Sequence, residues 1–169
     1  MIRTITLLAL LCGCASAPEP APPAAVSTVS LTPDWVREIR REAALSDSLI
    51  EVLPLADPAV ADLSALARAA EAAEAWDEVD QHLSAALVIA PRDPELWQWR
   101  AEAALARRAW HEAELHARRS ARLGPGLGAL CVRNWLTLKA AASESGDLAA
   151  AAKASTRAAR CPVPKPVRL

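Results

Sequence analysis

Apolar side chains recur at helical spacing through the middle of the chain. Two neighbouring stretches repeat at i, i+3, i+4 and i+7, the period at which one face of a helix is buried. The first contains Leu63, Leu66, Ala67 and Ala70, and the second contains Val79, Leu83, Ala86, Leu87 and Ala90. Only Ala75-Trp76-Asp77 separates them, so we expect an antiparallel pair of helices joined by a tight turn.

Helix starts are marked by a recurring pair of residues. Thr32-Pro33-Asp34 gives an N-cap followed by Pro at the first helical position, and the same arrangement recurs at Asp57-Pro58 and Asp93-Pro94. The Asp side chain can cap the first turn, and Pro suits the first helical position. Together with the apolar spacing, these signals predict helices near residues 33–53, 58–73, 77–90, 94–107, 111–123, 129–144 and 148–161.

The helical pair repeats further along the chain after one constant shift in residue number. The shift carries Leu63 onto Trp97, Ala67 onto Ala101, Ala70 onto Ala104, Trp76 onto Trp110 and Pro91 onto Pro125. A third copy matches once the connection at residues 124–128 is lengthened by four residues, which places Trp135 on Trp97. This third copy departs from the pattern at Lys139 and Ser155, as a terminal repeat with no successor can.

This pattern resembles the tetratricopeptide (TPR) repeat, whose period of about 34 residues matches the shift. The resemblance covers residues 60–162. It implies an all-α fold: a short TPR-like α-solenoid of about three helical hairpins, within a domain spanning residues 32–162. An N-terminal capping helix ended by Pro54 would precede the hairpins. Its inward residues would be Trp35, Val36, Ile39, Ala43 and Ala44. Alanine-rich hairpins of other solenoid or bundle types can mimic this spacing, and they are the alternative.

In the TPR family the first helices line a groove that holds peptides or partner helices. Carried over by position, the resemblance implies a partner-binding groove made of Ser64, Arg68, Glu71, Gln98, Trp99, Glu102, Arg133 and Thr137. Trp99 has two interpretations: an anchor for a partner, or a ring packed against the neighbouring first helix through Ala65. Trp97 and Trp135 fall on the core side, so we expect them to be structural.

The first residues resemble a bacterial lipobox. Arg3 precedes an apolar run that ends in Leu11-Cys12-Gly13-Cys14. The resemblance implies a signal peptide over residues 1–13 and a mature chain that begins at Cys14, which carries covalent diacylglycerol and fatty acid. Because Ala15 and not Asp follows, it also implies a lipid-anchored protein on the periplasmic side of the outer membrane. The alternative is an ordinary secretory signal with an incidental cysteine.

Composition divides the rest of the chain. Residues 14–31 are rich in Pro and Ala and have no apolar periodicity, so we interpret them as a lipidated tether; residues 163–169 form an extended tail. Residues 14–93 carry 5 basic and 14 acidic side chains, whereas residues 94–169 carry 13 and 6. The basic half could bind an acidic partner or pair head to tail with a second copy. Alternatively, its arginines complement helix C-termini.

The two remaining cysteines indicate a disulfide. Cys131 opens the first helix of the third copy and Cys161 ends the second, so an antiparallel hairpin places them side by side. The oxidising periplasm permits the bond, and closing a loop of about 30 residues would stabilise the fold by roughly 3 to 4 kcal/mol. Two free, merely adjacent thiols are the alternative.

Catalytic and metal-binding patterns are not recognisable. His111 and His116 are five residues apart, whereas two ligands on one helical face stand four apart. The glycines of residues 124–128 follow a predicted helix and lack the Lys-Ser or Lys-Thr of a phosphate loop. We therefore expect no enzyme activity, no metal and no cofactor beyond the lipid on Cys14. We also expect no nucleic-acid partner, because aromatic residues do not interleave with the basic ones.

These features favour a non-catalytic scaffold, a periplasm-facing outer-membrane lipoprotein whose TPR groove binds proteins of an envelope machine. Lipoproteins of this general kind act in pilus assembly, secretion, outer-membrane biogenesis and peptidoglycan synthesis. The alternative is an accessory or regulatory lipoprotein that binds an anionic envelope component such as peptidoglycan through its basic C-terminal half. Charge-led binding would weaken steeply with salt, whereas binding through an apolar anchor would not.

Overall fold

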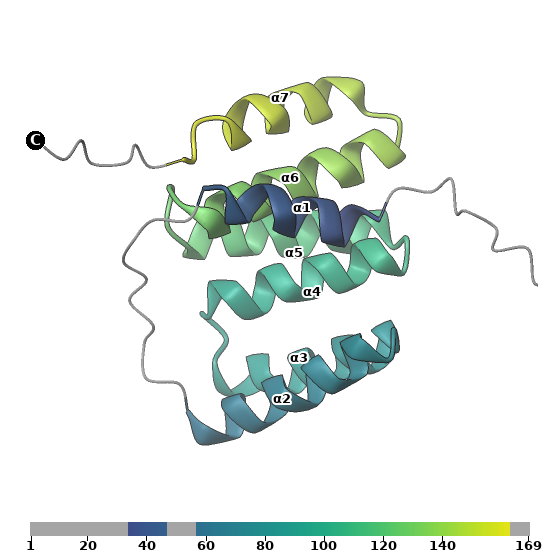
Figure 1. Ribbon diagram of the computed structural model, residues 1–169, viewed down its shortest axis with the longest axis vertical. Helices are drawn as coiled ribbons and strands as arrows, with labels where there is room; N and C mark the ends of the chain where they lie inside the picture. The colour runs from purple at the N-terminus through teal and green to yellow at the C-terminus, as the bar shows by residue number, and fades with distance from the viewer. Residues whose placement is uncertain (1–33, 47–56, 163–169) are drawn as a thin grey trace, which may run out of the picture. The chain divides into compact units, whose positions relative to one another are not determined.

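The computed structural model describes residues 34–46 and 57–162. The predicted signal peptide, the lipid on Cys14, the tether and the C-terminal tail lie outside the described residues. Within those two ranges the chain forms seven helices and no strand (Figure 1). The helices are α1 (Trp35–Ala44), α2 (Pro58–Ala72), α3 (Trp76–Ile89), α4 (Pro94–Ala106), α5 (Trp110–Leu123), α6 (Ala129–Glu144) and α7 (Leu148–Ala158). None of them is long and apolar enough to cross a membrane.

The helix starts predicted at Asp57-Pro58 and Asp93-Pro94 are confirmed in atomic detail. The Asp57 carboxylate accepts a hydrogen bond from the backbone N–H of Ala59 at 2.8 Å, and Asp93 accepts from that of Glu95 at 2.9 Å. Pro follows each Asp at the first helical position. Such caps satisfy backbone donors that the first turn leaves without a partner. The first start differs from the prediction: Asp34 is the N-cap of α1, through the N–H of Arg37, and the helix begins at Trp35 with no Pro at its first position.

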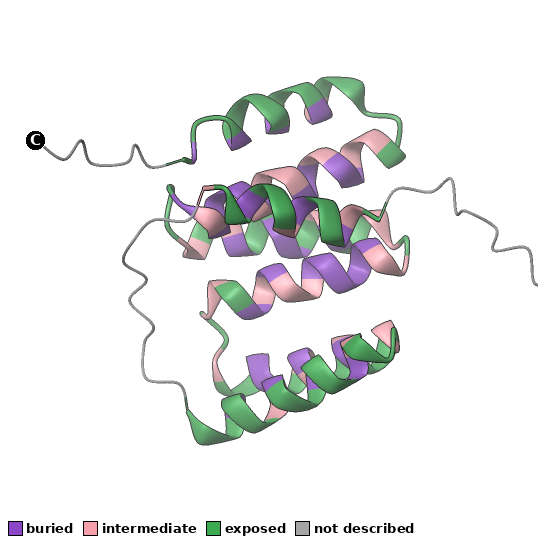
Figure 2. Cartoon of the chain, in the orientation of Figure 1, coloured by how far each residue is buried: buried purple, intermediate pink, exposed green. Residues whose placement is uncertain are grey.

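The all-α, solenoid-like fold is confirmed. Helices α2 and α3, α4 and α5, and α6 and α7 form three hairpins, and each hairpin packs on the next through α3 with α4 and α5 with α6. Small residues such as Ala67, Ala101 and Ala117 are fully buried, which allows the helices to approach closely. Figure 2 shows the buried residues gathered on the faces that neighbouring helices share.

The backbone repeats with the spacing found in the sequence. Each hairpin turn contains one residue with a left-handed backbone: Glu74 (φ 56°), Arg108 (φ 60°) and Gly146 (φ 80°). These positions are related by the same two shifts that carry each sequence repeat onto the next. Only the third turn uses glycine, the residue that adopts this conformation at no steric cost. The two other turns adopt it against the steric preference of an ordinary side chain.

Helix α1 differs from the predicted capping helix in both length and position. It ends at Ala44, well before residue 53, and Leu45 and Ser46 form a turn. Its backbone packs on α4 and α6 and not on α2 or α3, the hairpin that an N-terminal cap would cover (Figure 1). Val36 and Ile39 are buried there, whereas Ala44 is exposed. The apolar stripe of α1 therefore fills the inner face of the solenoid instead of its end.

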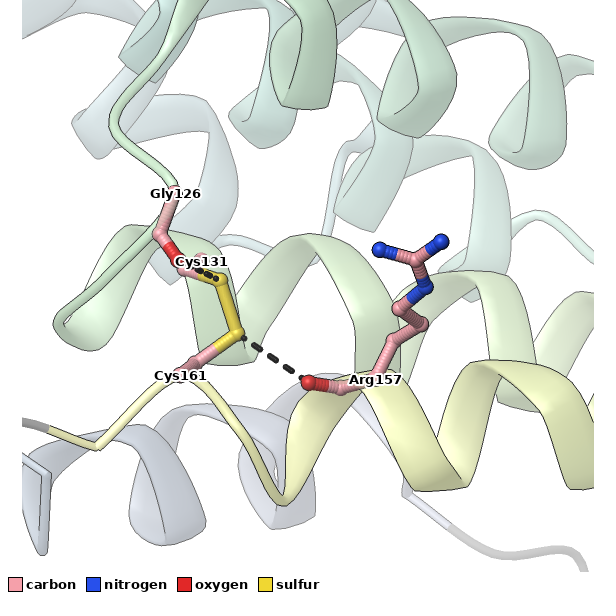
Figure 3. The surroundings of a disulfide bond; sticks show 4 residues. All are labelled: Gly126, Cys131, Arg157 and Cys161. Carbon is pink, nitrogen blue, oxygen red and sulfur yellow. Dashed lines mark hydrogen bonds between the residues drawn. A yellow bond between two sulfur atoms is a disulfide. The ribbon is translucent and has the colours of Figure 1, made fainter.

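The predicted disulfide is present in the structure. Cys131, near the start of α6, is bonded to Cys161, just beyond α7, with their Cα atoms 5.6 Å apart (Figure 3). Gly128 N–H donates a hydrogen bond of 2.7 Å to the Cys161 carbonyl oxygen beside it. The third hairpin is thus closed covalently at the end opposite its turn.

Candidate partner-binding groove

A groove opens between α2 and α4. Residues of α1, α2, α4 and α6 line it, and its volume is about 990 Å³. Its apolar lining consists of Ala43, Ala44, Val60, Ala61, Ala72, Leu96, Trp99, Ala129 and Leu130. Five predicted groove residues line it as well, namely Ser64, Arg68, Glu71, Trp99 and Arg133. The structure therefore brings more than half of the predicted set to one surface.

Trp99 forms part of the groove wall and is held by the neighbouring first helix. Its indole Nε1 donates a hydrogen bond to Glu71 Oε2 at 2.5 Å, and the Arg68 guanidinium carbon lies 5.7 Å from the ring centroid. The ring also packs against the core of the first hairpin. Ala65, the residue proposed to contact it, is exposed. Trp99 is consequently half-buried, with one part fastened to α2 and another part lining the groove.

Arg40 of α1 crosses the groove and joins two carboxylates. Its guanidinium pairs with Glu71 of α2, and its Nε donates a hydrogen bond of 2.7 Å to Glu102 Oε2 of α4. Burial opposes the charged form of Arg40, but the two carboxylates more than offset this and raise its pKa. One side chain of α1 therefore ties together the two sides of the groove.

Three predicted groove residues are not available to a partner. Gln98, Glu102 and Thr137 are fully buried. Gln98 Nε2 donates hydrogen bonds to Thr137 Oγ1 at 2.8 Å and to Glu102 Oε1 at 3.1 Å. They lie where α4 packs directly on α6, under α1. The expectation that they line an open groove is therefore wrong, because α1 occupies that part of the inner face.

Glu102 is the centre of a buried charge network. It accepts hydrogen bonds from Arg40, Gln98 and Arg133, and Arg133 also pairs with Glu95 at 2.7 Å. Burial alone would raise the pKa of Glu102, yet the two arginines lower it below its ordinary value. Burial likewise opposes the charge on Arg133, and its carboxylate partners raise its pKa nevertheless. Glu102 and its two arginines stay ionised, as buried charges do only when they are paired.

Trp97 and Trp135 lie at the edge of the core and not inside it. Both are half-buried. Trp97 Nε1 donates a hydrogen bond to the Pro91 carbonyl oxygen at 3.0 Å, and the ring of the buried His116 lies 5.4 Å away.

In the described ranges no three His, Cys, Asp or Glu side chains are placed to hold a metal ion.

Arg40 is a charged groove residue that sequence reasoning missed, besides the apolar residues of the lining. It follows Val36 by four residues, so it belongs to the same face of α1 that is buried against α4 and α6. A charged residue on an apolar helix face is a detectable signal. Its partners Glu71 and Glu102 could not be assigned, because the position of α1 depends on contacts 31 and 62 residues away.

Comparison with known proteins gives one informative likeness. No protein-family model and no curated protein matches the sequence. Among solved structures, the chain is similar to the globular C-terminal domain of LpoP from P. aeruginosa, with 29% identity and a TM-score of 0.57. The match covers 61% of this chain and 97% of that domain. The likeness thus extends over nearly a whole globular domain and supports the helical fold, while membership in the TPR family stays a prediction.

Proposed function

We propose that this chain is an accessory outer-membrane lipoprotein that faces the periplasm. Its helical domain would bind a protein of a peptidoglycan-related envelope machine in the groove between α2 and α4. The lipobox-like sequence at Cys14 and the likeness to the LpoP domain support the envelope location. Protein binding is proposed because of the groove between α2 and α4.

The groove suits an apolar segment of a partner protein. Its charged side chains are largely paired with one another, Arg40 with Glu71 and Arg133 with Glu95. The apolar walls and part of Trp99 are then the surface that an incoming segment can cover. Interfaces of this kind concentrate binding energy in a few half-buried aromatic and arginine side chains.

Crosslinking in intact cells can test the groove. A photoreactive amino acid placed at Ala61, inside the groove, should yield a discrete adduct with an envelope protein. The matched control is Leu66, which lies on the same helix and is 50% exposed but does not line the groove. Adducts at both positions, or at neither, would contradict binding in the groove.

Affinity measurements with the captured partner then test Trp99. Truncating a central tryptophan costs about 2 kcal/mol or more, so Trp99→Ala should weaken binding about thirtyfold. Leu66→Ala serves as the control and should bind like the parent. Helix content by circular dichroism shows whether the Trp99 variant folds. If it does not fold, Arg68→Ala is the substitute, because Arg68 is exposed and lines the same groove.

The anchor has its own test. Cells labelled with a radioactive fatty acid should incorporate the label into the protein, and Cys14→Ser should abolish it. Label that persists in this variant would overturn the lipid anchor but would leave the groove proposal intact.

The second candidate function is binding of an anionic envelope component by the basic C-terminal half. Several arginines of this half are exposed, among them Arg118 of α5 and Arg157 of α7. Binding through them should fall steeply as salt rises, because exposed charges are screened over about 8 to 10 Å. Binding in the groove should change little over the same range.

A further inference from the structure

The second and third hairpins each place an arginine over a tryptophan. The Arg119 guanidinium carbon lies 6.0 Å from the Trp97 ring centroid, and that of Arg157 lies 5.6 Å from the ring of Trp135. The shift that carries the second hairpin onto the third relates both the arginines and the tryptophans. The first hairpin has no such pair, because Leu63 stands where the tryptophan would be.

The surroundings of the two rings differ. Trp97 is also approached by Arg100, whose guanidinium carbon is 5.9 Å from the ring centroid, and by the ring of His116. Its face is therefore occupied by protein. Trp135 instead lines a cleft of about 480 Å³ between α5 and α7, together with Leu138 of α6. This volume lies within the range of small-molecule sites, and no residue of α1 lines the cleft.

The cleft has more available positive than negative charge. Glu114 is neutralised by Arg118 at 2.7 Å, so Asp147, which caps α7 by accepting from the N–H of Ala150 at 2.9 Å, is the one carboxylate among the described lining residues without a cationic partner. Lys153 and Arg157 also line the cleft and are exposed. Within the described part of the chain, neither of these two cations has a carboxylate partner. An incoming anion would find them unneutralised.

We propose that the α5–α7 cleft binds a carboxylate-bearing saccharide. The sugar ring would pack on Leu138 and the accessible part of Trp135, since an indole offers a flat, apolar surface with little conformational freedom to lose. Arg157 and Lys153 would bind the carboxylate, and a guanidinium can do so with two parallel hydrogen bonds. The site rests on the second candidate function, to which it gives a defined place, and it is separate from the groove between α2 and α4 and from the proposed protein partner.

Titration of the purified mature chain can test the site. The probe is the peptide-free disaccharide fragment of peptidoglycan, whose lactyl carboxylate is free. The same fragment with this carboxylate amidated is the uncharged form, and vesicles containing phosphatidylglycerol represent a lipid source of negative charge. Binding is followed by calorimetry and by the chemical shift of the Trp135 indole N–H. The free acid should bind and shift this resonance, whereas the amidated fragment should bind at least about tenfold more weakly.

Substitutions on the surface of α7 locate the site. The double variant Lys153→Gln/Arg157→Gln should weaken binding of the acidic fragment about tenfold or more. Two single variants are the controls. Arg160→Gln changes an exposed arginine outside the cleft, and Arg119→Gln removes the equivalent arginine over Trp97. Both controls should bind like the parent. Trp99→Ala should do so too, which separates this site from the groove.

Several results would overturn the proposal. They are no binding of the acidic fragment, equal binding of the amidated fragment, or an equal loss in Arg160→Gln, which would indicate an effect of overall charge. Vesicle binding that depends on Lys153 and Arg157 while the fragment fails to bind would assign the cleft to a lipid headgroup instead.

Discussion

Helices α2, α4 and α6 are the first helices of the three hairpins, and they meet at two junctions, α2–α4 and α4–α6. The two junctions occupy corresponding positions in the repeat, but different side chains fill them. At the α4–α6 junction the helices pack directly, and Gln98 bonds to Thr137 in a fully buried network. At the α2–α4 junction the two backbones do not pack on each other, and Trp99 bonds to Glu71 at the edge of an open groove. One junction is part of the core, and the other is a surface that a ligand can reach.

The size of one side chain explains much of this difference. Trp99 and Thr137 occupy the same repeat position, because the shift that relates the second hairpin to the third carries one onto the other. The separation of packed helices depends on the side chains at their contact. Threonine allows α4 and α6 to close and bond through its hydroxyl, whereas the indole holds α2 away from α4. Helix α1 then covers the closed junction and leaves the open one as a groove.

The largest loss of stability is expected when the Glu102 carboxylate is removed from the closed α4–α6 junction. Glu102→Ala leaves Arg40 and Arg133 without their shared buried partner, so the free energy of unfolding should fall by about 3 to 5 kcal/mol. Glu71→Ala at the open junction is the matched change; its side chain is 20% exposed and accepts from Arg40 and Trp99, so the loss should be smaller, about 1.5 to 3 kcal/mol. Urea unfolding followed by circular dichroism measures both. Equal losses would refute the distinction between the junctions.

Removal of the disulfide should cause the second largest loss of stability. Cys131 and Cys161 are 30 residues apart, and replacing both by serine should lower the free energy of unfolding by about 3 to 4 kcal/mol. Hydrogen exchange should accelerate in α6 and α7 and stay unchanged in α2 and α3. Mass analysis of the non-reduced periplasmic protein in which both thiols can be alkylated would show that the bond does not form in cells.

Truncating an apolar side chain of α1 should weaken the packing of α1 on α4 and α6. Ile39 is 2% exposed in the core shared by α1, α4 and α6, so Ile39→Ala should cost about 2 to 3 kcal/mol. Amide exchange should increase mainly in α1 and in the parts of α4 and α6 beneath it. Leu45→Ala, at a side chain that is 75% exposed, is the control and should change little.

The smallest effect concerns pH. Burial, together with nearby Arg100, lowers the pKa of His116 below its ordinary value. The unfolded chain therefore binds a proton more readily than the folded one, so stability is full above about pH 6.5 and falls as the pH decreases through that region. His116→Gln should flatten this dependence, and His111→Gln, at an exposed position of the same helix, should not. Melting temperatures between pH 5 and pH 8 provide the measurement. An unchanged slope in His116→Gln would assign the dependence to other groups.

Local signals in the sequence sufficed for the helices, the hairpins and the disulfide. Asp57 and Asp93 act over two or three residues as caps, and the regular repeat places small residues such as Ala67 and Ala101 at equivalent contacts. The Cys131–Cys161 bond follows from the antiparallel hairpin that joins them. These interactions join residues that are close in the sequence or that recur at a regular spacing. The residue types at those positions are therefore enough to predict them.

Tertiary structure alone decided which part of the inner face is open. The sequence assigned Gln98, Glu102, Thr137 and Trp99 to one groove, because position in the repeat says which way a side chain points but not what covers it. Arg40 reaches Glu102 across 62 residues, and no periodic pattern encodes such a contact. The place of α1 follows from its packing on α4 and α6, a property of packed volumes and not of any single segment.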